Sequence, residues 1–72
     1  MFTKNHEVTI ENGFAMDLVK VLGKYGIKFE VSQEYEGYLN EGRAWYRDFT
    51  IRANNRKMAK IMNEFYTNVK VN

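Results

Sequence analysis

The positively charged residues of this chain are concentrated in one stretch that could bind an anion. Six bases and a single acid, Asp48, occur between Arg43 and Lys60. Where this stretch enters a helix, free backbone N–H groups and the side chains of neighbouring bases would together bind a phosphate or a carboxylate group. The residues expected to form this anion or nucleic-acid site are Arg52, Asn54, Asn55, Arg56, Lys57 and Lys60.

Aromatic and arginine side chains occur together at the start of the same stretch. Residues 34–48, EYEGYLNEGRAWYRD, contain four aromatic rings and a turn through Asn40, Glu41 and Gly42. Tyr, Trp and Arg are enriched in protein interfaces, because they bring large contact areas and directional hydrogen-bond donors at low entropic cost. The residues expected to form a partner-binding surface are Tyr38, Leu39, Arg43, Trp45, Tyr46 and Arg47.

Catalytic and metal-binding residues are sparse in this sequence. His6 is the only histidine, and there is no cysteine. A metal site needs several such ligands, and a nucleophile needs a base held beside it. No glycine-rich phosphate-binding motif occurs, and the carboxylates are scattered. We therefore expect no enzymatic activity, no cofactor and no bound metal.

Length and composition indicate a single domain of residues 1–72. A chain of this size, 44% hydrophobic and 15% aromatic, can fold alone or as a small oligomer, so we expect a monomer or a homodimer. Without cysteine there is no disulfide framework, which favours a reducing compartment. The first residues do not form a signal peptide, and no apolar run is long enough to span a bilayer. These features predict a cytoplasmic protein that does not engage a membrane.

Hydrophobic periodicity predicts the elements that would position these residues. Alternating apolar and polar residues predict four strands, at residues 6–11, 27–31, 45–52 and 67–71. Apolar residues at helical spacing predict two helices, over residues 14–25 and 58–65. Asn12 would cap the start of the first helix and Gly26 would end it, while Asn54–Asn55 would cap the second.

The element order β-α-β-β-α-β is that of ferredoxin-like domains. It predicts an α+β fold in which two helices cover one face of a four-stranded antiparallel sheet. In the hairpin between the second and third strands, alternation places Tyr35 on the side of Val31 and Trp45 on the side of Phe49. These two rings would extend the core, whereas the tip of the hairpin would face solvent.

Residues 12–32, NGFAMDLVKVLGKYGIKFEVS, resemble the helix and second strand of ACT-type ligand-sensing domains, in which a glycine opens the helix and a Gly-Ile pair enters the next strand. This resemblance implies a dimer that binds a small ligand near Asn12-Gly13. The chain also lacks Cys and Pro and is rich in Tyr and Asn. In this composition it resembles phage-encoded host-takeover proteins, viral proteins that inhibit a host enzyme or defence factor by occupying its surface.

Three hypotheses about function follow. The first is a non-enzymatic binding protein that engages and modulates or inhibits a partner protein through the hairpin of residues 34–48 and the start of the second helix. The second is a nucleic-acid-binding regulator that uses the Arg and Lys cluster of residues 43–60. The third is an ACT-like dimer that senses a small ligand. Residues 29–42 contain four glutamates and no base, and these acids would lie beside the phosphate contacts of the second hypothesis.

Overall fold

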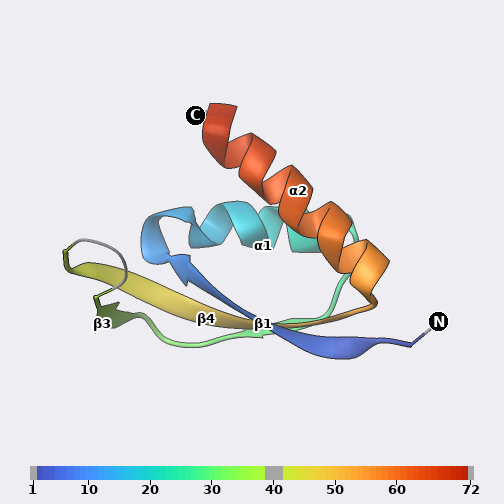
Figure 1. Cartoon of the computed structure of the whole chain (residues 1–72), viewed down its shortest axis with the longest axis horizontal. Helices are drawn as coiled ribbons and strands as arrows, with labels where there is room; N and C mark the ends of the chain where they lie inside the picture. Colours follow the sequence, from blue (N-terminus) through green and yellow to red (C-terminus); the bar gives the residue numbers. More distant parts are fainter. Residues whose placement is uncertain (1, 39–41, 72) are drawn as a thin grey trace.

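The chain forms one antiparallel sheet with both helices on the same face (Figure 1). The computed structural model describes residues 2–38 and 42–71. Its elements are, in order, β1 (Lys4–Glu11), the 3-10 turn η1 (Asn12–Phe14), α1 (Ala15–Lys24), β2 (Phe29–Val31), β3 (Tyr35–Gly37), β4 (Ala44–Ala53) and α2 (Asn55–Val71).

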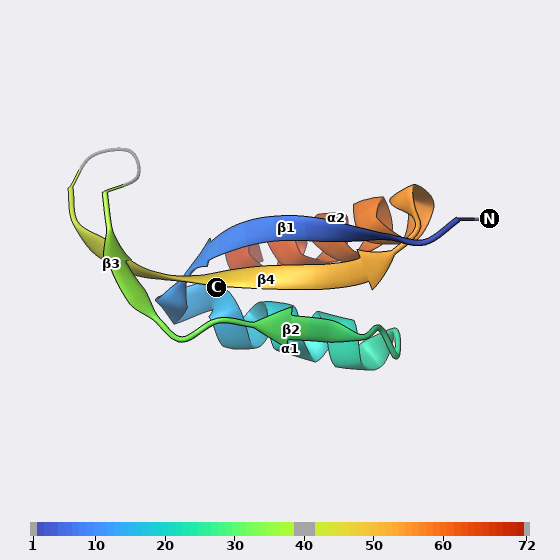
Figure 2. The same ribbon diagram turned by 90° about the horizontal axis from the view of Figure 1, so that it is seen from below.

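The central strand of the sheet is β4. β1 pairs with one edge of β4 along its whole length, from Lys4 opposite Ala53 to Glu11 opposite Tyr46. β2 and β3 pair in succession with the other edge of β4 (Figure 2). The sheet order is therefore β1-β4-β2, with β3 bonded to β4. The prediction of an α+β fold with a four-stranded antiparallel sheet and two helices is confirmed.

The strand predicted at residues 67–71 is wrong, because α2 continues to Val71. No glycine or proline interrupts the helix, and Val69 extends the apolar stripe of Met58, Ile61 and Phe65 against the core. Thr67 Oγ1 donates to the backbone oxygen of Asn63 at 2.9 Å, one helical turn earlier. The ferredoxin-like order is therefore not confirmed, and β1 is an edge strand among the residues that the structure describes.

Gly26 terminates α1, two residues after Lys24, as the sequence predicts. Gly26 has a φ of 62°, a conformation that favours glycine. The N–H of Ile27 donates to the oxygen of Leu22 at 3.0 Å, and the N–H of Gly26 donates to that of Gly23 at 3.1 Å, the bonding pattern of a glycine-terminated helix. The predicted cap at the other end is wrong, since Asn12 lies in η1 and Phe14 precedes α1 without a side-chain cap.

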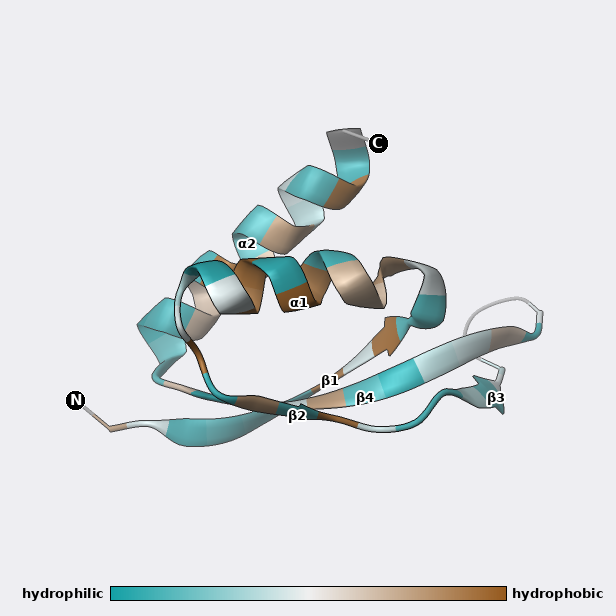
Figure 3. Cartoon of the chain, turned by 180° about the vertical axis from the view of Figure 1, so that it is seen from behind, coloured by the Kyte–Doolittle hydropathy of each residue, from teal (hydrophilic) through white to brown (hydrophobic). Residues whose placement is uncertain are grey.

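The core lies between the helices and the sheet. Along α1, hydrophobic and hydrophilic segments alternate, as expected for a helix with one buried side (Figure 3). Its fully buried side chains include Leu18 and Leu22 of α1, Phe49 and Ile51 of β4, and Ile61 of α2. Polar contacts join the C-terminal end of α1 to the middle of α2. Lys24 and the hydroxyl of Tyr25 both donate to Glu64 of α2, at 2.9 and 2.8 Å. These donors, Lys24 first, hold the pKa of the Glu64 carboxyl below its ordinary value.

Candidate partner-binding surface

A one-residue bulge separates β2 from β3 and sets the orientation of the hairpin. Val31 is opposite Phe49, whereas Tyr35 is opposite Tyr46, so residues 32–34 face only residues 47 and 48 of β4. One extra residue on one strand moves every later side chain to the other face of the sheet. Tyr35 therefore lies on the face opposite Val31, and the prediction that it joins the core is wrong.

Hydrogen bonds fix the geometry of the bulge. The N–H of Ser32 donates to the backbone oxygen of Asp48 at 2.9 Å, and the N–H of Asp48 donates to Ser32 Oγ at 2.9 Å. From the helix side, Arg47 Nη1 donates to the oxygen of Ser32 at 2.9 Å and Arg47 Nε donates to Asn12 Oδ1 at 2.6 Å. Asn12 Nδ2 in turn donates to Glu34 at 2.7 Å. Arg47 and Asn12 thus hold the base of the hairpin.

Beyond the bulge, the β3–β4 arm (residues 35–38 and 42–46) projects past the end of α1 (Figure 1). On the face of the arm away from the helices, Tyr46 is buried, with only 7% of its surface exposed. The ring of Tyr35 lies 6.3 Å from that of Tyr46, measured between centroids. A Cβ added to Gly37 would lie 3.1 Å from Tyr46 Cδ2, so the absence of a side chain there lets the Tyr46 ring pack closely. Tyr46 therefore stabilises the arm.

A small polar network borders this aromatic pair. Tyr35 Oη donates to Asp48 Oδ1 at 2.7 Å, and Thr9 Oγ1 donates to the same oxygen at 2.8 Å. The two hydroxyl groups, Tyr35 first, lower the pKa of the Asp48 carboxyl. The same bond to Asp48 raises the pKa of the Tyr35 hydroxyl. The sequence pattern did not indicate this network, because it depends on the register shift at the bulge.

The helix-facing side of the arm also carries exposed residues. Trp45 is the register partner of Glu36 and is 51% exposed, since α1 does not reach over it. The prediction that Trp45 extends the core is therefore wrong. Arg43 Nε lies 3.4 Å from the Glu36 carboxylate, so it is on the same side. Tyr38 is 72% exposed. Leu39, also predicted to bind a partner, lies outside the described residues.

An apolar hollow of about 320 Å³ opens at the base of the arm, between α1 and β2. Met16 and Val31, both exposed, form part of its wall, and Phe49 and Arg47 also line it. Met16 and Val31 are not among the predicted binding residues, because strand periodicity assigns Val31 to the core. The hollow also borders Asn12, where the resemblance to ACT-type domains implies a small ligand.

The predicted anion-binding residues lie at the opposite end of β4 from the arm. β4 has ten residues, which at about 3.3 Å per residue separate its ends by roughly 30 Å. The two predicted sites therefore do not form one continuous surface. Asn54 caps α2 as predicted, because its Oδ1 accepts the N–H of Lys57 at 2.7 Å. That N–H is consequently not free to bind an anion.

The bases at this end differ in their surroundings. Lys57 Nζ lies 5.3 Å from the centre of the Tyr25 ring, a cation–π distance. Arg52 is on the sheet face without helices, where its Nη1 donates a long bond of 3.4 Å to Asn5 Oδ1. Arg56 and Lys60 are exposed on α2, together with the Asn55 side chain. No ion pair within the described part of the chain involves Arg56 or Lys60.

The remaining chemistry is limited. His6 Nε2 donates to the backbone oxygen of Ala53 at 3.0 Å, which connects the start of β1 to the last residue of β4. Among residues 2–38 and 42–71, no three His, Cys, Asp or Glu side chains converge as metal ligands would. Within the same residues, no helix is long and apolar enough to cross a membrane. Comparisons with protein-family models, curated proteins and solved structures gave no match to this chain.

Proposed function

We propose that this chain is a non-enzymatic binding protein that engages a partner protein through the helix-facing side of the β3–β4 arm. The observation that carries the proposal is the exposure of Trp45, half of whose surface is open to solvent although its strand neighbours Tyr46 and Phe49 are buried. Arg43 and Tyr38 are exposed on the same arm. Aromatic and arginine side chains of this kind dominate the binding energy of protein interfaces.

Two structural features support this role. The bulge and the packing of Tyr46 under Tyr35 hold the arm in one conformation, which lowers the entropy lost when a partner binds. The apolar hollow beside Met16 and Val31 offers a socket for a side chain of the partner. In this proposal Tyr38, Arg43 and Trp45 contact the partner, whereas Tyr46 and Arg47 position them.

The start of α2 is not part of this contact surface, because it lies roughly 30 Å away along β4. A partner would have to be large to touch both ends. An arm that occupies the surface of a larger protein would modulate or inhibit that protein. This is the mode of action that the resemblance to phage-encoded host-takeover proteins implies.

A nucleic-acid-binding regulator is the second candidate. It is favoured by the exposure of Arg52, Arg56 and Lys60 near one end of the molecule. Phosphate binding by these residues would weaken steeply as salt is added, because bound counterions are released. Retention on single- or double-stranded nucleic acid that does not change between low and moderate salt would exclude this candidate.

The test of the first proposal uses two matched double variants. Arg43→Ala with Trp45→Ala removes one cation and one aromatic ring from the arm, and Arg56→Ala with Phe2→Ala removes one cation and one aromatic ring from exposed positions elsewhere. The wild type captures a partner from an extract of its native cell, and that partner is then purified. Its affinity for each variant is measured by titration calorimetry.

We expect the arm variant to lose at least about tenfold in affinity, since interface aromatic and arginine residues commonly contribute more than 1 kcal/mol each. The control variant should bind as the wild type does. Trp45 is the only tryptophan, so its fluorescence should also shift when the wild type binds. Equal affinities of the two variants, with both folded by circular dichroism, would refute the proposal.

A further inference from the structure

The outer edge of β1 is a row of unpaired backbone groups. Every pairing of β1 among the described residues is with β4, and Figure 2 shows β1 along the margin of the sheet. Edge strands readily pair with another strand, and proteins often protect them with charged side chains, proline, a bulge or a covering element. β1 pairs without a bulge over eight residues, and the chain has no proline.

The register between β1 and β4 identifies the backbone groups of β1 that point away from the sheet. Arg52 N–H donates to Lys28 on the β2 side of β4, so the alternate residues Ile51 and Phe49 direct their backbone groups toward β1. Their partners there are His6 and Val8. The residues of β1 that present their N–H and C=O groups to solvent are therefore Asn5, Glu7, Thr9 and Glu11.

We propose that a second copy of the chain pairs its own β1 antiparallel with this edge, around a two-fold axis at Val8. In this register the outward groups of Glu7 face those of Thr9 in the second copy, and Asn5 faces Glu11. Val8 lies opposite Val8 of the second copy, and both side chains are on the face of the sheet that the helices cover. A register centred on Glu7 or on Thr9 would instead place two glutamates directly opposite each other, which is unfavourable. The registers centred on Glu7 and on Val8 pair the most residues of β1, and of these two only the one centred on Val8 keeps the glutamates apart.

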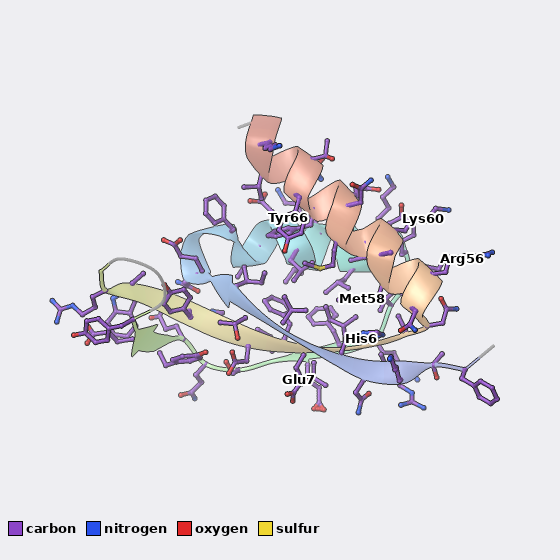
Figure 4. All side chains as sticks on the ribbon, viewed as in Figure 1. His6, Glu7, Arg56, Met58, Lys60 and Tyr66 are labelled. Atoms are coloured by element: carbon purple, nitrogen blue, oxygen red, sulfur yellow. The ribbon has the colours of Figure 1, made fainter. Side chains whose placement is uncertain are left out.

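The side of α2 above this edge carries two apolar side chains, which is an independent observation. Lys57 and Glu64 mark the side of α2 that faces α1, since they contact Tyr25. The opposite side of the helix carries Met62 and Tyr66, one turn apart. Tyr66 is 58% exposed, and Figure 4 shows it projecting from α2.

The spacing of the strands brings the two copies of α2 into contact. α2 lies behind β1 and β4 in Figure 2, whereas α1 lies behind β2. A helix centred above the β1–β4 pair would lie about 5 Å from the line between the two paired β1 strands, measured across the sheet, because strands are about 4.8 Å apart. The two copies of α2 would then be roughly 10 Å apart, the distance of packed helices. Met62 and Tyr66 would be buried between them, in one continuous sheet with four helices on one face.

A disulfide tests the proposed register directly. On the two-fold axis, the Cα atoms of the two Val8 residues would be about 4.5 Å apart, a distance that a disulfide can bridge. The chain has no other cysteine. Under mild oxidation in native buffer, Val8→Cys should form a covalent dimer much faster than Asn5→Cys, although position 5 is more exposed. Cross-linking of Asn5→Cys at the same rate or faster would overturn the proposed register.

If the cysteine variants fold poorly, the dependence of the molecular mass on concentration tests the proposal instead. Sedimentation equilibrium of the wild type should give a mass that rises toward the dimer with concentration. Glu7→Pro removes an N–H that the monomer does not use, so it should weaken the dimer about tenfold or more, whereas Glu7→Ala should not. A wild type that stays monomeric up to millimolar concentration, or equal dimer affinities of the two folded Glu7 variants, would refute the proposal.

Discussion

The hydroxyl of Tyr35 donates to Asp48 Oδ1 at 2.7 Å, and so links β3 to β4 across the bulge that precedes β3. This bond and the one from Thr9 lower the pKa of Asp48 below its ordinary value. A carboxyl whose pKa is lower in the folded state stabilises the fold at neutral pH. That contribution is lost as the pH falls through the lowered pKa.

Tyr35→Phe should therefore reduce the free energy of unfolding at neutral pH and have a smaller effect in acid, where Asp48 is protonated in both proteins. The pKa of Asp48 should rise in the variant. Urea unfolding at a series of pH values and a carboxyl NMR titration measure both effects. Tyr38→Phe is the control, because Tyr38 is exposed and no pKa shift of Asp48 is attributed to it. A destabilisation by Tyr35→Phe that is the same at every pH would contradict the explanation.

Gly37→Ala should destabilise the protein by about 1–3 kcal/mol, the usual effect of overpacking. Its Cβ would lie 3.1 Å from Tyr46 Cδ2, and the buried Tyr46 ring would have to move. Gly23→Ala is the matched control, since a Cβ there meets no atom within 4 Å and the position is helical. That change should stabilise the protein by about 0.5–1 kcal/mol. The two changes should therefore shift the midpoint of thermal unfolding in opposite directions.

Arg47→Lys should destabilise the fold by about 1–3 kcal/mol, because a lysine cannot reproduce both bonds of the guanidinium group, to Asn12 and to the oxygen of Ser32. Arg43→Lys should change the stability by less than about 0.5 kcal/mol, since Arg43 is exposed and its ion pair with Glu36 lies at the surface. Chemical denaturation compares the two. Similar stabilities for both variants would mean that Arg47 does not hold the bulge.

Asn54→Ala should lower the free energy of unfolding by about 1 kcal/mol, the typical effect of losing a helix cap. Asn54 Oδ1 accepts the N–H of Lys57, whereas the neighbouring Asn55 is exposed in the first turn of α2. Asn55→Ala should therefore be close to neutral. A larger loss for Asn55→Ala than for Asn54→Ala would reverse the assignment of the cap.

Local signals in the sequence predicted most of the elements. Alternation at Val8 and Ile10 predicted β1, and the apolar stripe of Leu18, Val21 and Leu22 predicted α1. Gly26 was recognised as a helix end because glycine readily adopts a positive φ. These features depend on residues close together in the chain.

The errors concern relationships between distant residues. Alternation alone could not show that residues 32–34 oppose only two residues of β4, so neither the face of Tyr35 nor the burial of Tyr46 was predictable. Asn12 is a good helix cap by residue type, but Arg47 engages its side chain instead. The pattern of residues 67–71 fits a strand or a helix, and continuous packing of α2 on the core decides for the helix.

The central position of β4 has a consequence for the order of events during synthesis. Every strand pairing in the described part of the chain includes β4, so β1, β2 and β3 have no strand partner in its absence. Lys4 pairs with Ala53, the last residue of the described strands to leave the ribosome. Most of the chain must therefore emerge before any of the sheet can form, and the first half stays exposed to chaperones and proteases until then.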